Sequence, residues 1–161
     1  MKIAIVSDTH DNLLNIRKAV EVINENDVDL VIHAGDYVSP FTAKEFKKLN
    51  CKMVGVFGNN DGDKVMLLKK FEGIAEIKDL IIEEIGGRRI FVTHGVNENV
   101  VKNAFCFGFD MVIFGHTHKL LIDENDGRLL INPGELCGYL TNKATFVILN
   151  LKNMRYEIIS L

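Results

Sequence analysis

The first third of the chain alternates between short apolar runs and a segment with helical spacing. The apolar runs are short enough to be strands, and they cover residues 2–6, 30–32 and 53–57. Between the first two, apolar side chains recur at the spacing of a helix, at Leu13, Ile16, Val20 and Ile23. A further helix is expected around Phe41, Phe46 and Leu49. This β-α-β-α-β order predicts parallel strands joined by right-handed helical crossovers.

The rest of the chain contains more strands, joined by tight turns. Two-residue turn signals separate pairs of strand-like runs at Gly86-Gly87, Asp126-Gly127 and Lys152-Asn153, and they predict antiparallel hairpins. Further helices are expected at residues 65–71 and 99–107, and a further apolar strand at 111–114. We therefore expect an α/β fold in which two mixed β-sheets pack together and are flanked by helices.

Length and composition favour one domain that spans residues 1–161. The length lies near the ~150 residues that serve as a prior for a single domain, and no Pro-, Gly- or Ser-rich stretch could act as a linker. Apolar residues make up 47% of the chain and charged residues 25%, which is enough to form a core without disulfides or metals.

Charge and cysteine usage limit the partners and the compartment. The formal net charge is −3 and no Lys/Arg cluster is present, so neither a nucleic-acid polymer nor a membrane is an expected partner. The three cysteines are widely spaced and form no Cys-x-x-Cys pair, which fits a reducing, cytoplasmic environment. No apolar run approaches the ~18 residues of a membrane span, and the N-terminal run is too short for a signal peptide.

Five of the predicted strands are followed by side chains that commonly bind metals. These side chains are Asp8, His10, Asp36, Asn59, His94, His116 and His118. In open α/β sheets ligands bind outside the carboxyl ends of the strands, so these loops can converge on one site. Nitrogen and oxygen donors without thiolate suit Mn²⁺, Fe, Co²⁺, Ni²⁺ or Zn²⁺.

The same residues form an ordered set of motifs. In chain order they are Asp8-Thr9-His10, Gly35-Asp36, Gly58-Asn59-Asn60-Asp61, His94-Gly95 and Gly115-His116-Thr117-His118. This set resembles the pattern of the calcineurin-like metallophosphoesterase superfamily, and the small size of the chain is similar to its compact single-domain prokaryotic phosphodiesterases. The resemblance covers essentially the whole chain and implies a four-layer α/β/β/α sandwich.

The resemblance also implies a reaction and a ligand set. Two divalent metal ions would bind, the first through Asp8, His10, Asp36 and His118 and the second through Asn59, His94 and His116. Asp36 would bridge both ions. A hydroxide that bridges the metals would then attack small phosphate diesters.

One position departs from the usual family pattern. Asn60 stands where a His is common, and we expect it to contact the substrate phosphate, although an amide cannot act as an acid. Asp61 and Asp11, in the same loops, are expected to be structural, and His33 is expected to be a hydrogen-bonded core histidine.

Two alternative functions remain open from the sequence. A phosphomonoesterase could use the same fold and the same metals. A non-catalytic interaction scaffold is also possible, because the retromer complex contains a subunit that resembles this fold. The oligomeric state is not determined, and a homodimer is one possibility.

Overall fold

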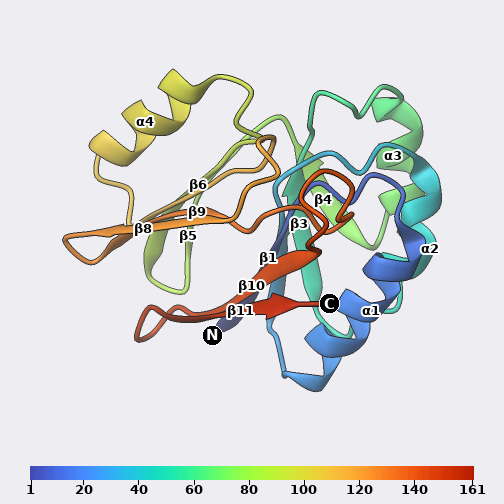
Figure 1. The fold of residues 1–161 in the computed structure, drawn as a ribbon, viewed down its shortest axis with the longest axis horizontal. Coiled ribbons are helices and arrows are strands. Elements are labelled where there is room, and N and C mark those ends of the chain that lie inside the picture. The colour runs from blue at the N-terminus through green and yellow to red at the C-terminus, as the bar shows by residue number, and fades with distance from the viewer.

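The fold is built on two mixed β-sheets, and the computed structural model describes residues 1–161 (Figure 1). The first sheet has six strands, in the spatial order β11 (Arg155–Ser160), β10 (Thr145–Asn150), β1 (Lys2–Val6), β2 (Leu30–His33), β3 (Lys52–Val56) and β4 (Ala75–Lys78). The second sheet has five, in the order β5 (Ile81–Ile85), β6 (Arg88–Val92), β7 (Met111–Ile113), β9 (Arg128–Asn132) and β8 (Leu121–Asn125).

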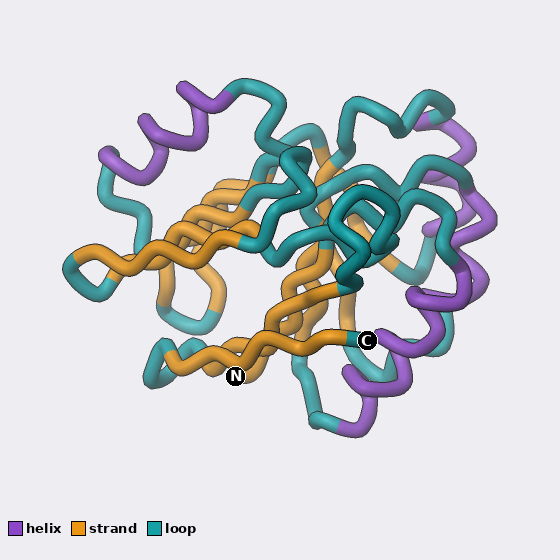
Figure 2. The backbone as a smooth tube through the Cα atoms, in the orientation of Figure 1, coloured by secondary structure: helices purple, strands orange, loops and turns teal.

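The helices cover the outer faces of the two sheets, as Figure 2 shows. Three α-helices lie against the six-stranded sheet, α1 (Leu13–Glu25), α2 (Ala43–Phe46) and α3 (Lys64–Phe71), and one 3₁₀ turn, η1 (Pro40–Thr42), precedes α2. The remaining helix, α4 (Glu98–Cys106), packs on the five-stranded sheet. The arrangement is the four-layer α/β/β/α sandwich that the sequence resemblance implied, so this expectation is confirmed.

The alternation of side chains along β1 shows why this strand is apolar on both faces. Ile3 and Ile5 point into the core between the two sheets, whereas Ala4 and Val6 point into the core beneath the helices. All four side chains are fully buried, and full burial of an Ile is worth roughly 1.5–3 kcal/mol. A central strand that separates two cores has no polar face, which is what the sequence of this run predicted.

Two local expectations need correction. The strand β4 was not expected, because Glu76 and Lys78 interrupt its apolar pattern; it forms by parallel pairing with β3 at the edge of the sheet. The expected helix around residues 41–49 is only the η1 turn followed by the four residues of α2. Phe41 in that turn is exposed over 77% of its surface and therefore is not a core residue.

The topology brings the carboxyl ends of five strands to one end of the sandwich. β1, β2 and β3 run parallel in the first sheet, and β6 and β7 run parallel in the second. The loops that follow these strands meet where the two sheets face each other. None of the helices has the length and hydropathy that crossing a membrane requires.

Candidate metal centre

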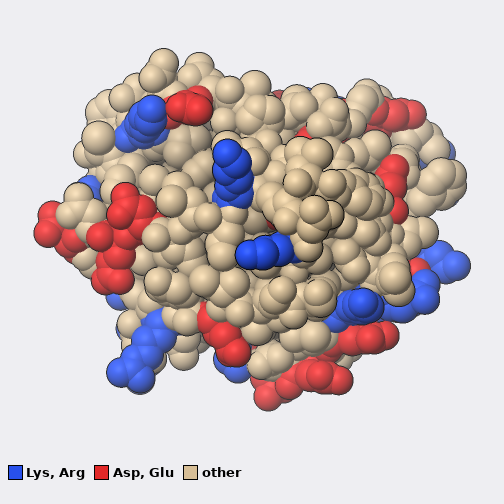
Figure 3. Space-filling view, in the orientation of Figure 1, with Lys and Arg blue, Asp and Glu red and all other residues tan.

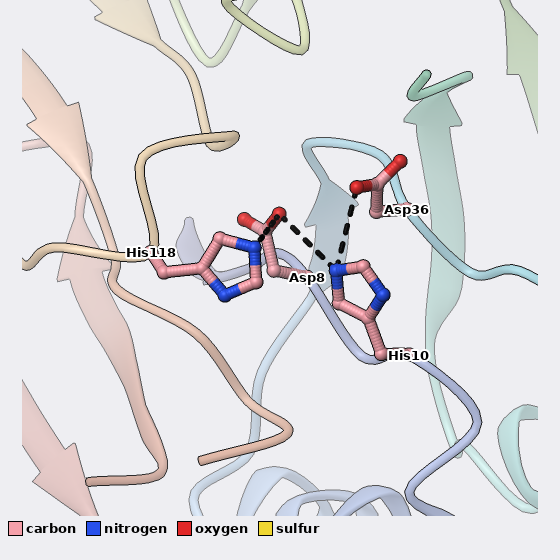
Figure 4. Close-up of side chains that lie close together, drawn as sticks. All are labelled: Asp8, His10, Asp36 and His118. Atoms are coloured by element: carbon pink, nitrogen blue, oxygen red, sulfur yellow. Dashed lines mark ion pairs between the residues drawn. The ribbon is translucent and has the colours of Figure 1, made fainter. Parts of the chain in front are cut away.

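Four of the expected ligands form a tight cluster at this end of the sandwich, shown in Figure 4. Their donor atoms all lie within 4.8 Å of one another, and the residues are Asp8, His10, Asp36 and His118. The Nε2 atom of His10 lies 3.8 Å from Asp8 Oδ1 and 3.4 Å from Asp36 Oδ2. The Nε2 atom of His118 lies 3.5 Å from the same Oδ1 of Asp8. A cluster of this composition and spacing can hold a divalent metal ion.

The other three expected ligands lie next to this cluster. His94 places its Nε2 3.3 Å from Asp36 Oδ2, and its ring stands edge-on to that of His116 with centroids 5.2 Å apart. The Nδ1 atom of His116 lies 2.9 Å from the side-chain oxygen of Asn59. The structure therefore brings all seven residues together in two adjoining groups.

Asp36 is the residue that connects the two groups. Its Oδ2 faces His10 on one side and His94 on the other, at 3.4 and 3.3 Å. The same carboxylate accepts hydrogen bonds from Asn60, from the backbone N–H to Oδ1 at 2.8 Å and from the side-chain amide to Oδ2 at 2.7 Å. Asn60 thus lies beside Asp36, and in this structure its side chain contacts that carboxylate directly.

The centre has an excess of negative charge at its floor. Asp8 and Asp36 are almost completely buried. The neighbouring carboxylates of Asp36 and Asp8 raise the pKa of His10 to about 9. Burial acts to raise the pKa of Asp36, but its contacts with His10 and His94 outweigh burial and hold that pKa below its ordinary value. A site that stabilises added positive charge in this way is suited to a cation.

Unpaired polar atoms also point to a cation. Asp8 Oδ1, His10 Nε2 and His94 Nε2 are buried and have no hydrogen-bond partner. Buried polar atoms without partners are costly, and these three lie within the two adjoining groups. The Nδ1 atom of His94 donates to the carbonyl oxygen of Ala34 at 2.8 Å, which leaves Nε2 free as a metal donor. The residues present therefore fit a bound metal.

The loops that carry these residues are conformationally unusual. Five of the seven expected ligands have positive φ angles, namely Asp8, His10, Asp36, His116 and His118. This region of φ disfavours most L-residues, and such backbone strain concentrates at functional sites. Gly58 lies so close to the loop that carries Asp36 that a Cβ atom at position 58 would come 2.1 Å from Asp36 Oδ1. Only glycine allows this approach.

Asp61 and His33 have the structural roles that the sequence indicated. The buried carboxylate of Asp61 accepts hydrogen bonds from the backbone N–H groups of Asp36, Val38 and Gly58, and so it joins the loops after β2 and β3. The ring of His33 accepts from the N–H of Gly35 and contacts the Thr9 hydroxyl.

Sequence reasoning missed Glu135, which supports one of the expected ligands. Its buried carboxylate accepts a hydrogen bond from His118 Nδ1 at 2.7 Å, so that Nε2 of this ring faces Asp8. It also accepts from the N–H groups of Leu140 and Thr141. Burial opposes ionisation, but the hydrogen bonds from His118 first, and then from Thr141, lower the pKa of Glu135 to about 2. The available signal was a carboxylate directly after the Asn132-Pro133-Gly134 turn.

Asn132 in that turn is a second supporting residue. Its side-chain amide donates to the carbonyl oxygen of Gly115 and to the Thr117 hydroxyl. It thereby fixes the loop that carries His116 and His118. The sequence alone explained this segment equally well as a simple turn.

Replacing Glu135 by Gln is expected to weaken metal binding by about 10- to 100-fold, because a neutral amide orients His118 less firmly and lowers its basicity. Calorimetric titration of the metal-free variant with Mn²⁺ measures this change. Glu124→Gln, on the exposed strand β8, is the matched control and should bind as tightly as the wild type. Unchanged affinity in Glu135→Gln would show that this carboxylate only shapes the following loop.

Comparison with known proteins agrees with the geometry. A sequence model described as the calcineurin-like phosphoesterase superfamily domain matches residues 1–154. The chain belongs to this superfamily. Its members depend on divalent metals, and the Asp and His cluster described above provides a place for them.

Individual relatives share the whole length of the chain. Phosphodiesterase MJ0936 of Methanocaldococcus jannaschii is 47% identical over 165 residues, covering 100% of this chain and 99% of that protein. A solved structure described as a novel archaeal phosphodiesterase superimposes with a TM-score of 0.96 at 46% identity and covers both chains completely. Vps29 of Chaetomium thermophilum has a TM-score of 0.73 at 15% identity, over 100% of this chain and 94% of that one, and shares the fold.

Proposed function

We propose that this protein is a metal-dependent phosphodiesterase that hydrolyses small phosphate diesters. The observation that carries the proposal is the convergence of seven residues with nitrogen and oxygen donors, Asp36 among them, in two adjoining groups. The relatives of similar length that are named phosphodiesterases support the same reaction.

The proposed centre holds two ions. Asp8, His10, Asp36 and His118 would bind the first ion, and Asn59, His94 and His116 would complete the second. Asp36 would serve both, because its Oδ2 lies between His10 and His94. Two divalent ions of the Mn, Fe, Co, Ni or Zn type supply activation of water and neutralisation of phosphate charge when bound.

Other residues of the site hold the metal ligands in position. Glu135 and the carbonyl oxygen of Ala34 fix the rings of His118 and His94, so that the donor atoms are in place before a substrate arrives. The side-chain amide of Asn60 donates a hydrogen bond to Asp36 in this structure. We propose that this amide can turn and donate to a phosphate oxygen of the substrate instead. The site thus combines fixed donors on its floor with an exposed polar contact at its mouth.

The remaining features of the proposal follow from composition. A net charge of −3 and scattered basic residues favour small diesters over nucleic-acid polymers. We propose a single-domain protein in the cytoplasm, where its three free cysteines would stay reduced. A scaffold role does not account for buried donor atoms that lack partners, so we favour the enzyme.

Turnover of a substrate panel in the metal-loaded protein tests the reaction. We expect nitrophenyl diesters to be cleaved faster than nitrophenyl phosphate, because the neutral amide at position 60 adds no positive charge to offset the second negative charge of a monoester. Hydrolysis rates with Mn²⁺, Ni²⁺ and Co²⁺ added in turn are the measurement. A clear preference for monoesters would instead identify a phosphomonoesterase, and no turnover on either class would favour a scaffold.

Asn60→His is expected to make the rate depend less on the leaving group. General acid catalysis is worth about 10² to 10⁴ in rate and matters most for strongly basic leaving groups. The wild type should therefore cleave nitrophenyl esters fast and alkyl esters slowly, and the variant should narrow this gap. The measurement is the slope of rate against leaving-group pKa, taken where chemistry limits turnover.

The contacts of Ser39 limit which second substitution could be combined with Asn60→His. The Ser39 hydroxyl donates to Asp11 at 2.8 Å, so a carboxylate introduced at position 39 would lie against that of Asp11. Asn60→His without a change at position 39 is therefore the primary test, and Asn60→Gln is its control. A wild-type rate that hardly varies with leaving-group pKa would mean that another group already supplies the proton.

A further inference from the structure

A cavity of about 510 Å³ lies between α4 and the start of β8, on the five-stranded sheet. This α4–β8 cavity has an apolar floor made by the buried side chains of Val101 and Phe114 and the half-buried Leu130. Leu120, which is 42% exposed, forms part of its rim. Its volume falls within the range of ligand sites for small molecules.

Several residues that line the cavity are chain neighbours of expected metal ligands. Gly95, which follows the expected ligand His94, lines one wall. Thr117, which lies between the expected ligands His116 and His118, lines another, and its hydroxyl is held by Asn132. Consecutive Cα atoms lie about 3.8 Å apart, so the chain places these parts of the cavity lining one residue away from expected ligands.

Basic side chains border the same recess. Lys119 directly follows His118, lines the cavity and is exposed, and it forms no ion pair. Lys102, on α4, also lines the cavity and pairs with Glu98 at 3.3 Å. Figure 3 shows that basic and acidic side chains are scattered over this face of the molecule. An unpaired cation beside an apolar recess complements a ligand that is both anionic and apolar.

We propose that the α4–β8 cavity binds an apolar or aromatic ester group of the substrate, while Lys119 attracts the phosphate anion. The inference rests on the proposed phosphodiesterase function and narrows its substrates to diesters with at least one such group. A larger groove, of about 690 Å³ between η1 and α3, contains none of the expected ligands or their chain neighbours and serves as the reference surface.

Binding of two stable phosphonates to the metal-loaded protein tests the cavity without any need for turnover. Phenylphosphonate and methylphosphonate share the anionic group and differ only in the apolar one. We expect calorimetry to give a dissociation constant about tenfold lower for phenylphosphonate. Leu130→Phe, which fills the floor of the cavity, should abolish this difference and leave methylphosphonate binding unchanged.

Further variants distinguish filling of the cavity from effects that any enlarged side chain could have on phosphonate binding. Met66→Phe enlarges a side chain in the reference groove and should keep the full preference for phenylphosphonate. Val101→Leu fills the cavity by a smaller amount and should reduce the preference partly, which covers the case in which Leu130→Phe does not fold. Lys119→Gln should weaken both phosphonates by the same few-fold factor, since the cation acts on the group that they share.

The outcomes distinguish this inference from the proposed function. Equal affinity for the two phosphonates in the wild type, or no binding of either, would overturn the cavity assignment even if diesters are hydrolysed. A phenyl preference that survives both filling variants would overturn it as well. If the protein cleaves no diester but prefers phenylphosphonate, and Leu130→Phe removes that preference, the proposed reaction is overturned. The cavity would then remain a binding site for ligands that carry both an apolar group and an anion.

Discussion

Asp36→Ala is expected to lower diester turnover by about 10³-fold or more and to remove metal from both halves of the centre. The reason is its position: one carboxylate oxygen faces His10 at 3.4 Å and His94 at 3.3 Å, so its loss opens both groups of donors together. A loss of several kcal/mol of charge stabilisation at a metal centre corresponds to a rate factor of this size. Elemental analysis of the purified variant measures the metal content beside the rate.

Two further variants make the result interpretable. Asp36→Asn keeps the shape of the side chain and a partner for Asn60, and so it isolates the effect of the charge. Asp79→Ala removes an exposed carboxylate that pairs with Lys64 and with none of the expected ligands, and it should leave turnover and metal content unchanged. If Asp36→Ala loses one metal equivalent and retains the other, Asp36 does not bridge.

Removal of bound metal is expected to abolish hydrolysis, and Mn²⁺, Ni²⁺ or Co²⁺ should restore it. In the proposed reaction the nucleophile is water activated by the metals, and the carboxylates and imidazoles of the centre would hold these ions. The protein should remain folded without metal, because both main cores consist of buried apolar side chains. Circular dichroism before and after chelation, with rates measured on the same samples, tests both statements.

Metal should also raise the melting temperature. A ligand that binds only the folded state stabilises it by about 2.7 kcal/mol at a free concentration 100 times its dissociation constant. The gain should be smaller in Asp36→Ala than in Asp79→Ala. Full hydrolytic activity in a sample that elemental analysis shows to be free of metal would exclude a metal-dependent mechanism.

The sequence by itself determined which residues could form the centre. Asp8, Asp36 and His94 each follow an apolar strand within a few residues, and short loops keep such side chains near the strand end. This information is local, because strand periodicity and loop length depend on neighbours in the chain. For the same reason β1 could be identified as a strand buried on both faces, and the hairpin of β5 and β6 could be placed at its Gly86-Gly87 turn.

Only the tertiary structure decided how distant segments meet. The last hairpin returns to the first sheet, where β10 pairs antiparallel with β1, and β4 becomes a strand only beside β3. Glu135 reaches His118 because β9 pairs with β7, which brings the loop after β9 next to the loop after β7. The α4–β8 cavity likewise exists only once α4 has packed on the second sheet. Such contacts depend on the packing of whole layers, and no spacing within the chain records them.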